Sequence, residues 1–122
     1  MYDFRAPMAR LGVPSLNRVT LSQNGTWHLP HGGAPVQHKP EGSIFSEIVG
    51  AVTELEFSDG QMWGLGECQY ETVARSITDL VVRLSIEMTE MEYAMVNGSM
   101  YVESGYIRSA LLVNPTGYGW AA

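Results

Sequence analysis

The chain has 122 residues, 45% of them hydrophobic and 16% charged, and its formal net charge at pH 7 is −6. This length suits one domain whose core needs neither disulfides nor metal, and the apolar runs are too short for a transmembrane helix, so we expect no membrane partner. An acidic chain with a single lysine has no cluster of cations to neutralise phosphates, so we also expect no nucleic-acid partner.

The N-terminal residues lead into no apolar segment typical of a secretory signal peptide, so we expect a cytoplasmic protein or one assembled into a virion. Cys68 is the single cysteine, which excludes an intramolecular disulfide. Residues 1–40 hold four basic residues and one acid, whereas residues 41–122 hold three and twelve. This asymmetry is either chance in a short chain or a sign that the N-terminal segment lies against the acidic remainder, its own or a neighbour's.

The start of the chain predicts an arm followed by a first hairpin. In residues 1–16 two prolines and a glycine interrupt any periodicity, which predicts an extended N-terminal arm. Residues 17–22 predict a strand, and Asn24-Gly25 favours a type I′ hairpin turn before a second strand at residues 26–29.

The next segments predict a loop and a second hairpin. Residues 30–42 are rich in Gly, Pro and His and predict a surface loop. In residues 53–58 apolar and polar side chains alternate with the period of a half-buried strand. Asp59-Gly60 supplies the turn, which places Phe57 opposite Met62.

The stretch from residue 71 to residue 96 is compatible with a helix or a strand. As a helix, its apolar residues follow spacings of three and four close to a heptad pattern, and Asn97-Gly98 would end it. As a strand, apolar and polar residues alternate, with a change of phase near Glu90 that predicts a bulge. A short helix near residues 70–78 is expected in either case.

Pairing across Asn97-Gly98 favours the strand. It sets Met95 opposite Met100 and Tyr93 opposite Val102, which would give a consistent buried face. Against the strand, the same register sets two glutamates opposite each other, Glu92 and Glu103, and the Glu- and Met-rich sequence has high helix propensity. Residues 106–113 predict the last strand.

Three Asn-Gly or Asp-Gly turns between alternating segments indicate the fold class. We expect a mainly β fold, or α+β with a minor helix, built as an antiparallel, hairpin-rich sandwich or partly open barrel. Residues 17–114 would form this single domain, with an extended aromatic tail at residues 115–122 as well as the N-terminal arm.

Three histidines, His28, His31 and His38, occur within eleven residues and are candidate metal ligands. A catalytic zinc site uses three protein ligands and a water, and a carboxylate such as Glu41 or Glu67 could contribute. The spacing matches no standard helical pair of ligands, so a solvated, histidine-rich loop is the alternative. Beyond this possible zinc or other transition metal, no cofactor is expected.

Two further motifs carry little chemistry. Cys68 would need a histidine base to act as a nucleophile, and free cysteines are more often buried small hydrophobic residues. Gly64-Leu65-Gly66 has only part of a phosphate-binding glycine pattern, and we interpret it as a turn. We therefore assign no catalytic residue.

The terminal segments predict contacts between copies of the chain. Interfaces favour Tyr, Trp, Met and Arg and disfavour Lys, and this chain has six Tyr, three Trp, seven Met, six Arg and one Lys. The alternative is that both termini fold back on their own domain. The candidate interface residues are Tyr2, Phe4, Arg5, Arg10, Tyr118 and Trp120.

The leading hypothesis is a non-enzymatic structural protein that forms a homo-oligomer through its terminal arms, as a component of a virus or phage particle. Its partners would be copies of itself and other subunits of the particle. One alternative is a small metal-binding module or metal-dependent enzyme that uses the three histidines. Another is a monomeric, inhibitor-like protein-binding module with an acidic face formed by Glu87, Glu90, Glu92 and Glu103.

Overall fold

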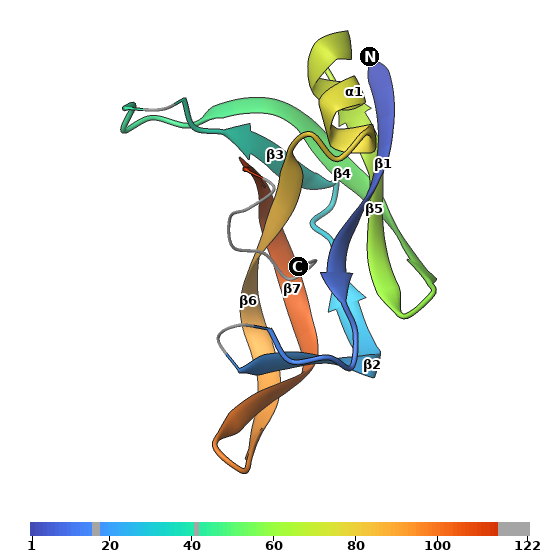
Figure 1. Ribbon diagram of the computed structural model, residues 1–122, viewed down its shortest axis with the longest axis vertical. Coiled ribbons are helices and arrows are strands. Elements are labelled where there is room, and N and C mark those ends of the chain that lie inside the picture. The colour runs from blue at the N-terminus through green and yellow to red at the C-terminus, as the bar shows by residue number, and fades with distance from the viewer. Residues whose placement is uncertain (16–17, 41, 115–122) are drawn as a thin grey trace.

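The structure is a computed structural model that describes residues 1–15, 18–40 and 42–114. Within these residues the chain forms seven strands and one short helix (Figure 1), which confirms the mainly β fold with a minor helix. The elements in chain order are β1 (Tyr2–Arg10), β2 (Val19–His28), β3 (Ala34–His38), β4 (Glu47–Ser58), β5 (Gln61–Cys68), α1 (Glu71–Thr78), β6 (Arg83–Val96) and β7 (Ser99–Val113).

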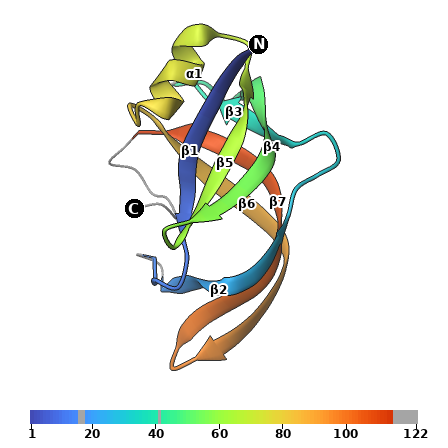
Figure 2. The same ribbon diagram turned by 90° about the vertical axis from the view of Figure 1, so that its right-hand side faces the viewer.

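The strands form one strongly curved sheet (Figures 1 and 2) in the order β1-β5-β4-β3-β7-β2, with β6 paired to β7. The sheet does not close into a barrel, in keeping with the expected open arrangement. It is mixed and not purely antiparallel, because β7 runs parallel to both β2 and β3 while it is antiparallel to β6.

Two predicted hairpins and the predicted helix are confirmed. Asp59 and Gly60 both have positive φ, 54° and 70°, in the turn between β4 and β5, and Phe57 lies opposite Met62 as predicted. Positive φ at both central positions is the signature of a type I′ turn. Helix α1 occupies residues 71–78.

The segment that follows α1 is the strand, not the helix continued. Asn97 and Gly98 turn the chain between β6 and β7, with φ of 51° and 78°, and Met95 faces Met100. The predicted bulge is present, since Glu90 has a φ of 52° and the register shifts beside it. A separate register shift between Glu92 and Tyr93 sets Glu92 opposite Ser104 instead of a second glutamate, which avoids the like-charge pair.

The prediction of a hairpin at Asn24-Gly25 is wrong, because both residues lie inside β2. The two halves of β2 pair with successive parts of one strand, β7, and the register shifts between Leu21 and Thr26. A Cβ atom on Gly25 would lie 2.9 Å from the carbonyl oxygen of Glu103. The backbone of β2 can therefore approach β7 this closely because residue 25 has no Cβ atom. Pairing with the distant strand β7 outweighs the local preference of Asn24-Gly25 for a turn.

The N-terminal segment is extended, but it is not a separate arm. Residues 2–10 form β1, which pairs with β5, and the side chains of Phe4, Ala6 and Met8 are buried. Pro7 is tolerated because β1 pairs only with β5 and the register shifts next to this proline. Likewise, the stretch 30–42 is not loop throughout, since it contains β3.

The interpretation of Gly64-Leu65-Gly66 as a turn is also wrong, because all three residues lie within β5. A Cβ atom on Gly64 would meet the side chain of Met8, and one on Gly66 would meet the ring of Phe4. The two glycines therefore leave room for β1 side chains to cover the backbone of β5.

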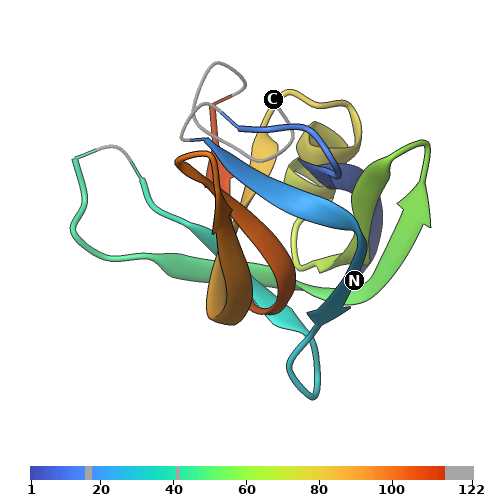
Figure 3. The same cartoon turned by 90° about the horizontal axis from the view of Figure 1, so that it is seen from below.

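The sheet is curved (Figure 3), and α1 packs against the core, in which Ala74 and Ile77 are buried. The β6–β7 hairpin extends beyond the remaining strands (Figure 2). The largest fully buried side chains are those of Met8, Leu21, Val36, Val52, Met62, Cys68, Ile77, Leu84, Val102 and Ile107.

Candidate functional site

The structure does not bring the three histidines together as a metal site. The His28 ring, at the end of β2, stacks on Tyr106 of β7 with ring centroids 6.4 Å apart. His31 lies in the turn that follows, and His38 is the last residue of β3. Among the residues that the structure describes, no three His, Cys, Asp or Glu side chains are grouped so that they could hold a metal ion.

Of the two carboxylates proposed as additional ligands, the structure describes Glu67. Glu67 is an exposed residue of β5 and lies opposite Asp3 and Ala51 in the sheet. Glu41 lies outside the described residues. Within the described residues, the three histidines and Glu67 are therefore not grouped as a metal centre.

Cys68 is a buried packing residue at the end of β5. Its side chain is fully buried, and burial raises the pKa of its thiol because the thiolate would lose hydration. A raised pKa lowers the fraction of reactive thiolate at neutral pH. The environment of Cys68 is that of a structural cysteine.

The candidate interface residues of the N-terminal segment have different environments. Phe4 is part of the core and is not available to a neighbour, whereas Tyr2 and Arg10 are exposed. The Arg5 guanidinium donates to a carboxylate oxygen of Glu56 at 3.0 Å and lies 4.0 Å from the centroid of the Trp63 ring. This basic side chain thus pairs with an acid of its own chain.

The interface residues expected in the tail, Tyr118 and Trp120, lie outside the described residues. The glutamates of the expected acidic face are all on the β6–β7 hairpin. Glu87, Glu90, Glu92 and Glu103 are exposed there.

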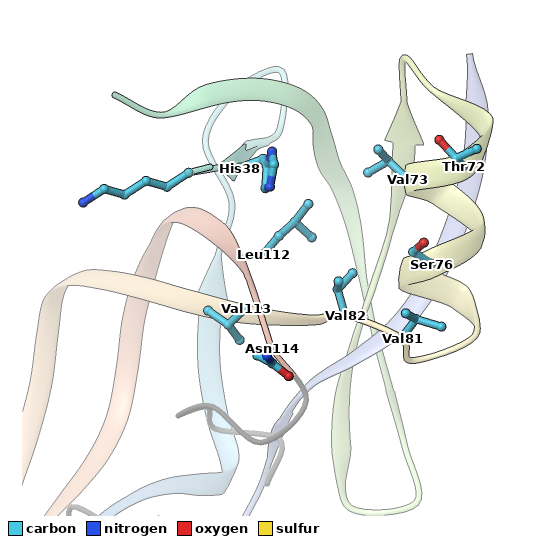
Figure 4. A pocket seen from close by; sticks show the side chains of 10 residues that line it. His38, Thr72, Val73, Ser76, Val81, Val82, Leu112, Val113 and Asn114 are labelled. Carbon is cyan, nitrogen blue, oxygen red and sulfur yellow. The ribbon is translucent and has the colours of Figure 1, made fainter. Parts of the chain in front are cut away.

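A groove that the sequence did not reveal lies between α1, the segment that joins α1 to β6, and the ends of β3 and β7 (Figure 4). We call it the α1–β7 groove. Its volume is about 420 Å³. Apolar side chains contribute most of its lining, and polar side chains from α1, β3 and the end of β7 complete it. The lining residues are Val73, Val81, Val82, Leu112 and Val113, with His38, Lys39, Thr72, Ser76 and Asn114.

The loop between β3 and β4 carries large apolar side chains into solvent. Ile44 is 84% exposed and Phe45 is 75% exposed. Ser43 organises the turn before them: its N–H donates to the carbonyl oxygen of Pro40 at 3.0 Å, and its Oγ accepts the N–H of Phe45 at 3.1 Å. We call Ile44 and Phe45 the apolar loop tip. In Figure 1 this loop projects from the sheet beside β3.

A second exposed apolar cluster lies at the end of the β6–β7 hairpin. The prediction that Tyr93 and Met95 belong to a buried face is wrong, since they are 56% and 61% exposed. Val96 and Tyr101, on the opposite face of the same hairpin end, are exposed as well. The cause is that this end of the hairpin extends beyond the strands that could cover it (Figure 1).

Alternation along the chain could have identified the residues of the hairpin cluster, but only the fold shows that nothing in the described chain covers them. The described residues contain no helix that is long and apolar enough to cross a membrane. No protein family, curated protein or solved structure matches the chain.

Proposed function

We propose that this protein is a non-enzymatic structural subunit that assembles with copies of itself, as a component of a virus or phage particle. The observation that carries the proposal is the pair of exposed apolar clusters, one at the apolar loop tip and one at the end of the β6–β7 hairpin. They point away from different ends of the sheet (Figure 1). Exposed clusters of this kind mark interaction surfaces.

Two surfaces that point in different directions are what a growing assembly requires. A subunit with one such surface stops at a pair, whereas a second surface on another side lets further copies add. The composition of the chain supports the same function, because Tyr, Met, Trp and Arg are frequent and lysine occurs once.

The free energy gained by burying one apolar loop tip is too small to hold two copies together. Full burial of a side chain such as Ile44 or Phe45 stabilises a contact by roughly 1.5–3 kcal/mol, so one apolar loop tip supplies about 3–6 kcal/mol. Association costs about 4–15 kcal/mol in lost translational and rotational freedom. Stable assembly therefore requires that each copy make several such contacts at once.

The contacts differ from those expected at the N-terminus. Because Phe4 is in the core and Arg5 pairs with Glu56, the candidate interface residues of β1 that remain are Tyr2 and Arg10. The proposal therefore rests on the loop tip and the hairpin, and not on a free N-terminal arm.

Size-exclusion chromatography with light scattering tests the proposal. We expect a mass that rises above the 13.4 kDa of one chain as the protein concentration increases through the micromolar range. The double substitution Ile44→Ser, Phe45→Ser should reduce that mass. Phe57→Ser is the matched control, because Phe57 is also exposed but lies in the β4–β5 hairpin. A mass of one chain at every concentration would contradict the proposal.

A monomeric protein-binding module is the second candidate, favoured by the four exposed glutamates of the β6–β7 hairpin. Such a face would attract a basic partner, and the association rate would fall steeply with ionic strength. The same light-scattering experiment separates the two functions, because this candidate stays monomeric.

A further inference from the structure

The last described residues of the chain form one wall of the α1–β7 groove. Leu112, Val113 and Asn114 all line it, and Figure 4 shows Asn114 at the edge of the same space. Eight residues follow Asn114 in the sequence, and the first of them is Pro115. A proline cannot donate the next hydrogen bond of a strand, so the chain leaves the sheet here. The aromatic tail, residues 115–122, therefore starts at the groove.

The apolar side chains of the groove are only partly covered by the described chain. Val73, Val82 and Leu112 pack against the core but are half-buried, and Val81 is 61% exposed. The volume of about 420 Å³ falls in the range of pockets that enclose compact ligands. An apolar pocket with a few polar groups at its edge typically takes a largely apolar occupant.

The charged residues at the groove do not favour a charged occupant. His38 and Lys39 border the groove, but His38 lies opposite Glu47 in the pairing of β3 with β4. This edge of the groove therefore carries an acid as well as a base. A charged group placed against the valines and the leucine of the lining would lose hydration without gaining a partner there.

The aromatic tail has the chemistry that such a groove accepts. It contains no charged side chain, and its two large side chains are those of Tyr118 and Trp120. Aromatic side chains bury large apolar areas, while the hydroxyl and the indole N–H can bond to polar groups at the edge of a pocket. Gly117 and Gly119 flank Tyr118, and glycine gives the backbone the freedom to reverse its direction.

The length of the tail also permits the contact. An extended chain spans at most about 3.3–3.6 Å per residue, so the segment from Asn114 to Trp120 can reach up to about 20 Å. Asn114 already borders the groove, so the tail needs to reach no further than across the groove itself.

We propose that the aromatic tail folds back into the α1–β7 groove of its own chain and covers the apolar lining with Tyr118 and Trp120. A segment on so short a linker has an effective concentration in the millimolar range, roughly a thousandfold above that of another copy at micromolar concentration. The tail of the same chain is therefore favoured over the tail of a second copy. This inference goes beyond the proposed function and does not depend on it.

Cysteine cross-linking within one chain tests the contact directly. The test variant combines Thr72→Cys, in the groove wall formed by α1, with Gly119→Cys in the tail. The matched control combines Thr78→Cys with Gly119→Cys, because Thr78 is exposed on the same helix but does not line the groove. Under mild oxidation the intramolecular disulfide should form at least about five times faster in the test variant. Native Cys68 is buried, and Thr72→Cys alone checks that it stays unreactive.

The unfolding temperature supplies a second measurement. Trp120→Ser removes one inserted side chain, and Val81→Asp places a charge in the groove lining. Each should lower the Tm by at least about 5 °C in a domain of this size. Val13→Asp changes an exposed valine outside the groove and should lower the Tm by less than about 2 °C.

The two substitutions should also depend on each other. In a chain that already carries Trp120→Ser, Val81→Asp should cost less than about half of its effect in the native chain, because the contact that it disrupts is absent. Circular dichroism spectra check that each variant folds.

Each outcome decides the inference. A faster intramolecular disulfide in the test variant, together with non-additive losses in Tm, would support it. Equal rates in the test and control variants, or additive losses, would overturn it. A disulfide-linked dimer would show that the tail of a second copy fills the groove, and a small molecule retained in native mass spectra would show a different occupant; either result would overturn the inference. The light-scattering experiment decides the proposed function separately.

Discussion

Replacement of Gly66 by alanine tests how closely β1 and β4 approach the backbone of β5. A Cβ atom at this position would overlap the carbonyl oxygen of Ala51, and it would lie 2.9 Å from the carbonyl carbon of Ala51 and 2.7 Å from Cζ of Phe4. The Ala51 atoms belong to the backbone of β4, so no side-chain rotation can relieve the overlap. The strand itself must shift.

Gly64, two residues earlier in the same strand, provides a matched comparison. The three atoms nearest to a Cβ there all belong to the side chain of Met8, with Sδ the closest at 2.6 Å. Methionine is flexible and adapts to a changed cavity. Overpacking costs about 1–3 kcal/mol, and we therefore expect about 3 kcal/mol of lost stability for Gly66→Ala and about 1 kcal/mol for Gly64→Ala.

Thermal and urea unfolding followed by tryptophan fluorescence measure the difference. For a domain of this size, about 3 kcal/mol corresponds to a fall in Tm of about 10 °C. The double variant Gly66→Ala, Phe4→Leu should recover little of that loss, because the overlap with Ala51 remains. If Gly64→Ala proved as destabilising as Gly66→Ala, the backbone constraint would not be the reason for the glycine.

Three further predictions concern single residues. Leu80 has a φ of 59° and is 39% exposed, so Leu80→Gly should raise the free energy of unfolding by about 1 kcal/mol and raise the Tm measured by calorimetry. Burial raises the pKa of the Cys68 thiol above its unfolded value of about 8.5. The contribution of this thiol to the free energy of unfolding should therefore be fully present below the unfolded pKa and be lost as the pH rises from there through the folded pKa. Urea unfolding between pH 7 and 10 should show no such loss in Cys68→Ala. Arg5→Ala loses the contacts with Glu56 and Trp63, and because these groups are partly exposed the loss in urea unfolding should be only about 1 kcal/mol.

Local patterns predicted the elements whose pairing is local. The hairpin at Asp59-Gly60 joins neighbouring strands, so alternation plus a turn of two residues was enough to predict the opposition of Phe57 and Met62. The same holds for β6 and β7 from the turn back to Tyr93, beyond which the register shifts.

Long-range pairing accounts for most of what the sequence did not reveal. The apolar alternation of Phe4, Ala6 and Met8 was present in the sequence, but Pro7 concealed it, because a proline suits a strand only at an edge or beside a register shift. The edge position of β1 follows from its pairing with β5, which lies far along the chain. The turn preference of Asn24-Gly25 likewise gives way to pairing with β7.

Exposure and grooves are properties of the assembled sheet. Alternation correctly placed Tyr93 and Met95 on one face, but it could not show that this part of the hairpin projects beyond its neighbours. The α1–β7 groove combines residues of β3, α1 and β7 with the segment that joins α1 to β6, and no sequence spacing connects them. The three histidines are close in sequence, yet among the described residues they are not grouped into a metal site.

The parallel pairing of β2 with β7 has a consequence for how the chain reaches its native state. Val19 lies opposite Met100, about 80 residues later, and β3 also pairs with the last strand, β7. Contacts between such distant segments slow folding, because chain entropy is lost before the pairing compensates for it. On the ribosome, β2 would emerge long before its partner strand, with the apolar side chains of Leu21 and Trp27 still uncovered. Assembly between copies would then begin only after the final strand is in place.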